Sequence, residues 1–512
     1  MSAEKASTDA RPGFLAARMA AVLLCTCGVP LLTLGLVHWL YAVPISAYRP
    51  LINDEVVFSH QASTFSRAGF NGGYYTLNEA TNPSGFTPFG PHGAGFPVLY
   101  GLFGALFGWH RHDVLVLNLL AIGVAGWIWA ACTRLTTGRL LTSALLLLTF
   151  WPMVFWAASG MQEGLHQAGA IAFAALFACA LRGRPSSRLA LTGWVALVLF
   201  SYIRPSWTVL MPMWALVTAT APTARGIAAR LAGSALVAAL VIVAFSRSAA
   251  PVPNSFFFLD DVSTAAQIAL NGVRMNLERA LQVTEYSELE VLNRAQYMGW
   301  LVATCLGAGV LAWTSRRRGE RMTAHLPLAA VSIVLIVGLL FVFYAVTNWT
   351  EHRIVSAFVL FGALVCTAAP GRLPLVLATL LALSNVAATA IFVRGFEAGH
   401  RDQFVWDRRG AYQLEEALVK HVAYRPNQPR WCNTVLTAQY PPYLIAVPAG
   451  IGLSVVREPD TVAMPPRSRY LLLDAPSEAE FTAPLHVKTL ATLPYGTLYE
   501  NLDARCGSDA AR

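Results

Sequence analysis

Long apolar runs separated by short polar breaks make up most of the first 393 residues. The first run covers about residues 19–43 and follows Lys5, Arg11 and Arg18. Because it is longer than the apolar core of a signal peptide and shows no clear small-residue cleavage site, it predicts a membrane helix that begins in the cytoplasm. The pattern as a whole predicts an α-helical polytopic membrane protein with about eleven transmembrane helices. The further runs of spanning length lie at about 114–132, 139–158, 164–181, 189–203, 206–222, 231–249, 297–315, 326–348, 354–369 and 373–393.

Basic residues orient these helices. If the helices alternate in direction from a cytoplasmic N-terminus, the inner breaks collect the arginines and the outer loops collect most of the acids. An excess of arginine on the cytoplasmic side is the sequence signal for orientation. The same alternation requires the apolar stretch 95–109 to lie at the interface or to re-enter the membrane, and it places the C-terminus outside. The inner arginines are Arg134, Arg139, Arg182, Arg184, Arg188, Arg225, Arg230, Arg316, Arg317, Arg318, Arg321 and Arg372.

Two larger pieces face outward under this topology. The first outer loop, residues 44–113, is rich in glycine, proline and aromatic residues and is too long for a simple connector. We therefore expect a transmembrane module over 1–393, with interfacial helices in that loop, and a small extracytoplasmic α/β domain over 394–512. Cys432 and Cys506 lie in this domain, where an oxidising compartment would allow them to pair. The β-like runs of the domain lie at 434–437, 451–456, 470–473 and 487–493.

The composition narrows the class of protein. Of the 512 residues, 55% are hydrophobic and 13% are charged, whereas a soluble globular protein has about a quarter of its residues charged. For the chain as a whole, a soluble globular protein, an intrinsically disordered chain and a disulfide scaffold are therefore excluded. The net charge of +9 follows from the arginines of the inner breaks, so we expect no nucleic-acid partner.

Several charged residues occur in segments that are predicted to open on the outer side. Asp54 and Glu55 follow the first helix by about ten residues, Glu163 lies in a tight turn, and Arg204 and Arg353 lie in two others. An arginine fork can hold a lipid-linked phosphate, and a carboxylate can remove the proton from an acceptor hydroxyl. The sequence therefore predicts a site in which Asp54 or Glu55 lies beside both arginines.

Each of these residues also has a simpler interpretation. Asp54 and Glu55 are suited to the first turn of an interfacial helix, and Glu163 is suited to the start of the helix that follows it. Arg204 could extend towards lipid phosphates, and Arg353 could pair with its neighbour Glu351. His92 is most simply a loop histidine. Only the convergence of these residues favours a catalytic site.

Familiar catalytic motifs are otherwise absent from the sequence. We find no phosphate-binding P-loop, no HExxH motif, no CxxC pair and no GxSxG motif. The adjacent acids Asp260 and Asp261 form a weak candidate for a divalent ion, because no further ligand spacing accompanies them. We expect no metal site and no cofactor.

Five motifs, in this order, resemble the GT-C superfamily of integral-membrane glycosyltransferases, in particular the mannosyltransferases that use polyprenyl- or dolichyl-phosphate sugars. The resemblance is one of arrangement over about residues 18–395. It departs from the family at Gly93 and Ala94, where prolines are common, and at Ile354, where an aromatic residue is common. The motifs are NDE at 53–55, GPHGAGFPVLYGLFGALFG at 90–108, SGMQEG at 159–164, IRPS at 203–206 and TEHRIV at 350–355.

The resemblance implies catalysis on the extracytoplasmic face of a membrane, which we expect to be the bacterial inner membrane. The donor would be a monosaccharide on a polyprenyl phosphate, and the acceptor a glycan, a lipid or a protein. By analogy Asp54 is the general base, with Glu55 as the competing assignment. The residues expected to bind substrate or phosphate are Arg204, Arg353, His92, Glu163 and Glu351.

Two other functions fit parts of the pattern. A transporter or flippase for a lipid-linked intermediate would usually carry ionisable groups near the middle of the membrane, whereas these helix interiors are nearly free of charge. An O-antigen polymerase or ligase also has many spans and a large outer loop. This chain resembles those enzymes less, because its acidic motif directly follows the first helix.

Overall fold

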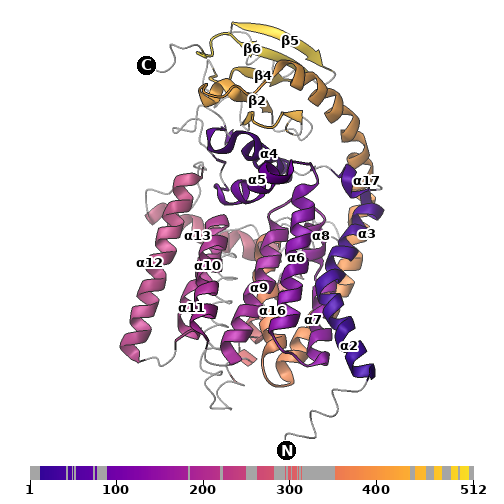
Figure 1. Cartoon of the computed structure of the whole chain (residues 1–512), viewed down its shortest axis with the longest axis vertical. Helices are drawn as coiled ribbons and strands as arrows, with labels where there is room; N and C mark the ends of the chain where they lie inside the picture. Colours follow the sequence, from indigo (N-terminus) through magenta and orange to yellow (C-terminus); the bar gives the residue numbers. More distant parts are fainter. Residues whose placement is uncertain are drawn as a thin grey trace, which may run out of the picture.

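The computed structural model describes a helical bundle, a layer of two helices above it and a sheet on top (Figure 1). The described residues are 12–41, 53–72, 89–182 except 91, 185–219, 223–249, 262–281, 352–438 and most of 444–506, with shorter pieces at 44–50, 75–77 and within 295–313. The predicted span at 326–348 and the acids Glu351, Asp260 and Asp261 lie outside these residues.

Five described helices are long and apolar enough to cross a membrane. The first is continuous through α2 (Pro12–Leu23), a π-helical turn η1 (Leu24–Gly28) and α3 (Val29–Tyr41). Most of these spans match the predicted runs in position. The other four are α6 (Asp113–Cys132), α9 (Glu163–Arg182), α12 (Ala224–Ser248) and the first part of α17 (Leu373–His421).

Two of the predicted spans are not straight helices of spanning length. Residues 139–158 form α7 (Thr137–Thr149) and α8 (Trp151–Ala157), which meet at an angle of 56° and together make at most a sixth span. Pro152, near the start of α8, lacks the N–H that a continuous helix would need. Residues 206–222 form a 3-10 turn, η4 (Pro205–Val209), and the eight-residue helix α11 (Leu210–Val217).

Shorter apolar helices complete the bundle. They are α10 (Ser187–Ile203), a helix over Met298–Gly307 and α16 (His352–Ala368). A further helix, α13, covers Val262–Leu281. The predicted total of about eleven spans therefore remains a prediction.

The first outer loop folds over one end of the bundle. Its helices α4 (Asn53–Ala68) and α5 (Gly95–Phe107) lie between the bundle and the sheet (Figure 1). They approach closely at Gly101, where an added Cβ would lie 2.7 Å from the carbonyl oxygen of Ala62 and 2.7 Å from Cβ of Phe65. The α5 helix has 13 residues, which at 1.5 Å per residue is too short to cross a bilayer.

A six-stranded sheet forms the top layer, in the order β1-β3-β2-β4-β6-β5. Its predicted strands are confirmed as β2 (Thr434–Ala438), β3 (Gly452–Val456), β4 (Tyr470–Leu473) and β5 (Val487–Leu493). Two strands were not predicted: β6 (Gly496–Asn501) and β1 (Tyr75–Leu77). The first four strands in that order are parallel, and β6 is antiparallel to both β4 and β5.

Strand β1 comes from the first outer loop, so the sheet joins the two predicted domains. It pairs parallel with β3, with Tyr75 opposite Leu453. The long helix α17 runs from the bundle up the side of the molecule to the same sheet (Figure 1). Beyond β6, Cys506 forms a disulfide with Cys432.

Apolar side chains from three segments fill the space under the sheet. The set includes Val56 and Phe65 of α4, Leu414 and Leu418 of α17, and the inner face of the strands. Thr64 of α4 accepts a hydrogen bond from the backbone N–H of Gly450 at 3.3 Å. The helix that carries Asp54 therefore belongs to the core of the outer layers.

Candidate active site

Four charged side chains from four distant segments meet where α4 faces the bundle. Arg353, on the second residue of α16, donates to Asp54 of α4 at 2.7 Å, and its Nε lies 3.8 Å from a carboxylate oxygen of Glu163. Arg204, just before η4, donates to the same oxygen of Glu163 at 2.8 Å. Asp54, Glu163, Arg204 and Arg353 thus form one network, in which Asp54 pairs with Arg353 and both arginines approach Glu163.

Glu163 is the centre of this network. It begins α9, its side chain is only 2% exposed, and both arginines approach it. Two positive charges around a buried carboxylate offset the cost of removing that carboxylate from water. The position at the first turn of α9 adds the favourable field of the helix N-terminus.

Asp54 differs from its neighbour Glu55 in exposure. The side chain of Asp54 is 38% exposed, whereas Glu55 is 1% exposed. One oxygen of Glu55 accepts hydrogen bonds from the hydroxyl of Tyr48 and from the backbone N–H of Gly160. Glu55 therefore joins the first outer loop to the turn that precedes Glu163, and Asp54 is the more accessible of the two acids.

The turn before Glu163 has a second support. Asn118 of α6 donates to the carbonyl oxygen of Met161 at 2.8 Å and accepts a hydrogen bond from the hydroxyl of Tyr100. Side chains of α5 and α6 thus hold the same turn through Met161, next to the residue that Glu55 contacts. These contacts were missed from the sequence, because Asn118 and Tyr100 lie inside apolar runs with no motif around them.

His92 lies in the loop before α5, near the network. Its ring packs edge-on against Phe58 of α4, with centroids 4.7 Å apart. Burial lowers the pKa of His92, and the charges of Asp54, Arg353, Arg204 and Glu163 act on it in smaller and opposing amounts. The imidazole is therefore neutral at pH 7 and able to donate or accept a hydrogen bond beside the network.

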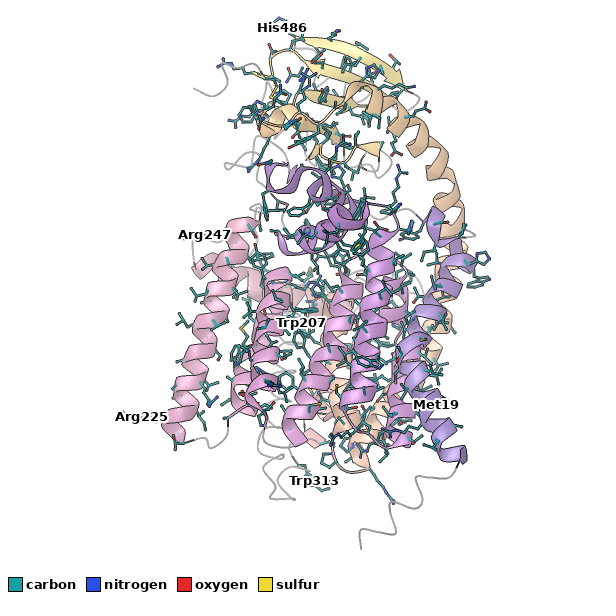
Figure 2. The ribbon with its side chains drawn as sticks, viewed as in Figure 1. Met19, Trp207, Arg225, Arg247, Trp313 and His486 are labelled. Atoms are coloured by element: carbon teal, nitrogen blue, oxygen red, sulfur yellow. A yellow bond between two sulfur atoms is a disulfide. The ribbon has the colours of Figure 1, made fainter. Side chains whose placement is uncertain are left out.

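A second polar layer lies one helical turn below the ion pairs. His166 of α9 accepts a hydrogen bond from the indole N–H of Trp207 at 2.9 Å, and Gln167 donates to Ser356 at 2.6 Å. Trp207 lies inside the helical bundle (Figure 2). The spacing of Glu163 to His166 and Gln167 could have indicated a shared helix face.

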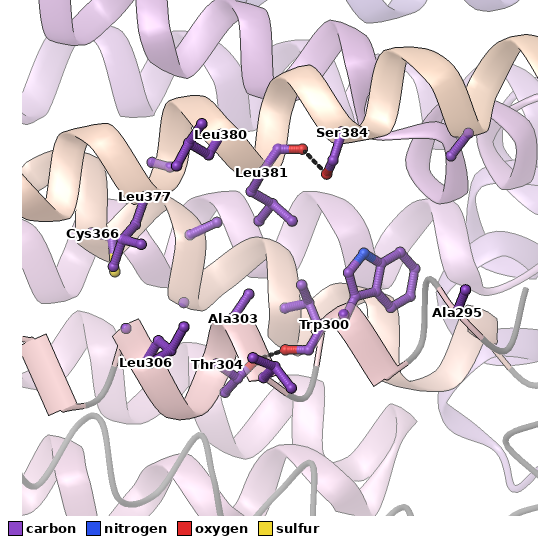
Figure 3. A pocket seen from close by; sticks show the side chains of 18 of the residues that line it. Ala295, Trp300, Ala303, Thr304, Leu306, Cys366, Leu377, Leu380, Leu381 and Ser384 are labelled. Carbon is purple, nitrogen blue, oxygen red and sulfur yellow. Dashed lines mark hydrogen bonds between the residues drawn. The ribbon is translucent and has the colours of Figure 1, made fainter. Parts of the chain in front are cut away.

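An apolar pocket of about 420 Å³ opens along α16 and α17 (Figure 3). Trp300 and Thr304 of the helix over Met298–Gly307 form one wall, and Cys366 of α16 and Leu381 of α17 form others. Val359 lines the pocket and lies six residues beyond Arg353 on α16, or about 9 Å along the helix axis. The pocket and the charged network therefore share a helix.

The opposite end of the bundle carries a separate set of contacts. Arg139 at the start of α7 donates to the carbonyl oxygens of Thr367 and Gly371 in the turn between α16 and α17, and Arg18 donates to Leu135. Two of the predicted inner turns, at 133–139 and 369–372, therefore meet at this end, and the charged network lies at the other end.

Among the described residues, no group of three histidine, cysteine, aspartate or glutamate side chains is placed to hold a metal ion. The network consists of two guanidinium groups and two carboxylates, and the neutral imidazole of His92 lies near it. Such a set can bind a phosphate through the arginines and accept a proton on a carboxylate.

The chain matches no protein-family model and no curated protein. Solved structures similar to it include the oligosaccharyltransferase of Archaeoglobus fulgidus in complex with zinc and sulfate, at 13% identity over 90% of this chain and 68% of that chain, with a TM-score of 0.49. ArnT from Cupriavidus metallidurans bound to undecaprenyl phosphate is similar at 13% identity over 94% of this chain and 99% of that chain, with a TM-score of 0.46.

The same ArnT in the apo state is similar at 14% identity over the same shares of the two chains, with a TM-score of 0.43. At these identities and TM-scores the function has to be argued from the site itself.

Proposed function

We propose that this protein is a membrane glycosyltransferase that moves a monosaccharide from a polyprenyl phosphate to a glycan, lipid or protein acceptor. The observation that carries the proposal is the meeting of Asp54, Glu163, Arg204 and Arg353 in one network above an apolar pocket. A lipid-linked phosphate needs paired cations at the membrane surface and an apolar path for its tail. The network supplies the cations and the pocket supplies an apolar path.

In the proposed reaction the acceptor hydroxyl attacks the anomeric carbon from the side opposite the phosphate. The bond between that carbon and the phosphate oxygen breaks, and the polyprenyl phosphate leaves with the electron pair. The proton of the hydroxyl passes to Asp54 as the new glycosidic bond forms. Arg204 binds the donor phosphate, and Arg353 stabilises the negative charge that grows on the leaving phosphate.

Donor binding and activation of the base are coupled in this scheme. Arg353 holds Asp54 at 2.7 Å, and a carboxylate in an ion pair is a poor base. Because Asp54 is 38% exposed and Glu163 is 2% exposed, an incoming phosphate exchanges more readily with Asp54. The phosphate then occupies Arg353, and Asp54 is released towards the acceptor.

The same proposal places the site on the extracytoplasmic face. The disulfide between Cys432 and Cys506 supports an oxidising compartment for the sheet that packs on α4. Arg18 and Arg139, which the sequence predicts on the inner side, bind backbone carbonyls at the other end of the bundle, in agreement with the positive-inside rule.

The test compares Asp54→Asn with the wild type in nanodiscs, using prenyl phosphates that carry radiolabelled hexoses or pentoses. We expect Asp54→Asn to lower transfer by at least about 100-fold, which is typical of the loss of a general base. The control is Asp113→Asn, because Asp113 makes a turn contact with His110 outside the network. Retained transfer in Asp54→Asn removes Asp54 as the base. If the wild-type protein moves the lipid-linked sugar across a vesicle membrane and leaves it covalently unchanged, the proposal of a glycosyltransferase is wrong.

A further inference from the structure

The polar layer below the ion pairs repeats their connections. Glu163 of α9 contacts Arg204 and Arg353, and one turn further along α9 His166 contacts Trp207 while Gln167 contacts Ser356. Trp207 and Ser356 each lie three residues after one of the arginines. Each partner segment is therefore attached to α9 twice, once by an ion pair and once by a hydrogen bond.

The contact between His166 and Trp207 fixes the state of the imidazole. An indole N–H can only donate, so Nδ1 of His166 must carry a lone pair, and the ring is neutral with its proton on Nε2. Both side chains are buried, at 1% and 0% exposure. A neutral ring in this place adds no positive charge beside Arg204.

The rest of Trp207 is held by packing. Its ring lies 4.7 Å from that of Phe358 on α16 and 5.0 Å from that of Phe173 on α9, measured between centroids. Packing alone leaves the ring free to adjust along an apolar surface, whereas the hydrogen bond to His166 fixes the height of the turn relative to α9. Pro205 restricts the backbone dihedral angles between Arg204 and Trp207. The position of Trp207 along α9 therefore determines the position of the Arg204 guanidinium.

Resting on the proposed function, we propose that His166 and Trp207 are positioning residues that hold Arg204 in place for the donor phosphate. They do not touch the reacting atoms. Without their hydrogen bond, the turn over Arg204–Trp207 is free to shift along α9, and Arg204 loses its fixed distance from Glu163 and from the phosphate. The effect should appear in donor binding more than in the chemical step.

The test is Trp207→Phe, which removes the N–H and keeps an aromatic ring. The matched control is Trp214→Phe, because Trp214 is also buried and donates its N–H to the carbonyl oxygen of Ala190, away from the network. We expect Trp207→Phe to raise KM for the lipid-linked donor by about 10-fold with kcat within about threefold, and Trp214→Phe to change neither. Equal KM values in the wild type and both variants overturn the proposal.

A second pair keeps the proposal testable if Trp207→Phe folds poorly. His166→Asn retains an acceptor near the position of Nδ1 and should keep KM close to that of the wild type, whereas His166→Leu should behave like Trp207→Phe. Equal KM values in these two variants overturn the positioning role.

A double-mutant cycle measures the coupling between Trp207 and Arg204. Because Trp207 acts through Arg204, the KM effects of Trp207→Phe and Arg204→Lys should not multiply in the double variant. Multiplying effects overturn the proposal. Wild-type protein that neither transfers sugar nor binds undecaprenyl phosphate refutes the proposed function instead, whereas an active wild type with unchanged variants refutes only the positioning role.

Discussion

At the scale of single residues, three carboxylates within one site have different surroundings. Asp54 is partly exposed and paired with Arg353, Glu55 is buried under two hydrogen-bond donors, and Glu163 is buried between two arginines. A proton acceptor must be reached by its substrate, and a structural carboxylate must keep its donors satisfied. Under the proposed function, these surroundings favour Asp54 as the base, whereas Glu55 links two segments and Glu163 anchors the arginines.

Glu55→Gln separates these roles. The amide oxygen of glutamine can accept the hydrogen bonds of Tyr48 and Gly160, so we expect transfer within about tenfold of the wild type. Glu55→Leu leaves both donors unsatisfied and should destabilise the protein by about 1–3 kcal/mol. Transfer assays and thermal melts check both. A Glu55→Gln variant as inactive as Asp54→Asn would make Glu55 the base.

At the scale of elements, α4 determines where the base lies, and its neighbours determine where α4 lies. The helix is covered by α5 on one side and by the sheet on another. Close approach to α5 depends on Gly101, since a side chain there would meet the backbone of Ala62. The geometry of the site therefore depends on packing well outside it.

Gly101→Ala tests that dependence. The added methyl group would lie 2.7 Å from both the carbonyl oxygen of Ala62 and Cβ of Phe65, so α5 must move away from α4. We expect a destabilisation of about 1–3 kcal/mol and a marked loss of transfer. Gly138→Ala is the control, because no atom lies within 4 Å of an added Cβ there. Unchanged melting and transfer in Gly101→Ala would show that α4 does not need this contact.

His60 makes the junction between α4 and the sheet sensitive to pH. Burial lowers the pKa of His60 to about 4, against an opposing effect of the backbone of Pro448. In the unfolded chain the pKa is about 6.5, so between about pH 6.5 and 4 only the unfolded chain takes up the proton. This group therefore removes up to about 3 kcal/mol of stability as the pH falls through that window, and it has no effect above it.

Melting temperatures of the wild type and His60→Gln between pH 4 and 8 measure this contribution. We expect the wild type to lose more stability than the variant on acidification and to behave like it above pH 7. Parallel curves over the whole range would contradict a buried neutral His60.

The sequence predicts these elements unevenly, for physical reasons. The length of the apolar runs and the charged residues between them predict α6, α9 and α12. This succeeds because each charged residue placed in lipid has its own free-energy cost, so spans can be recognised from the residues of a single segment. Pro152 indicates the break between α7 and α8. The mean hydropathy of the run does not reveal this break, because the residues on both sides of it are apolar. Strand β1 has three residues and is stabilised by pairing with β3, so no local pattern reveals it.

The site is also only partly predictable. The alternation of helices brings Asp54, Glu163, Arg204 and Arg353 to one end of the bundle, and the structure places them in contact. Which acid faces which arginine depends on the rotation of each helix, which the sequence does not specify. The contact between His166 and Trp207 joins two apolar runs and had no charge to mark it.

At the scale of the whole molecule, several contacts stabilise the sheet and its attachment to the first outer loop and α17. Strand β1 enters the sheet, Arg111 beyond α5 pairs with Glu415 of α17, and a disulfide joins Cys432 to Cys506. The sheet in turn covers the apolar face of α4. The C-terminal region is therefore expected to support catalysis without supplying a reacting group.

Removing the disulfide with Cys506→Ser should reveal this support. A crosslink over 74 residues stabilises the folded sheet by about 4 kcal/mol in the chain-entropy description. We expect a lower melting temperature and a loss of transfer on mild heating that begins earlier than in the wild type. Cys27→Ser, which removes an exposed free thiol, is the control. Heat-inactivation curves that coincide for all three proteins would show that the sheet is dispensable.

The pairing of Tyr75 with Leu453 has a consequence for how the protein is made. The ribosome must add 378 more residues after β1 before its partner strand exists, which takes about 20–75 s at ordinary rates of synthesis. During that time α4, which carries Asp54, is not covered by the sheet. Under the proposed function, we therefore expect a chain that ends before β3 to be inactive towards lipid-linked sugars.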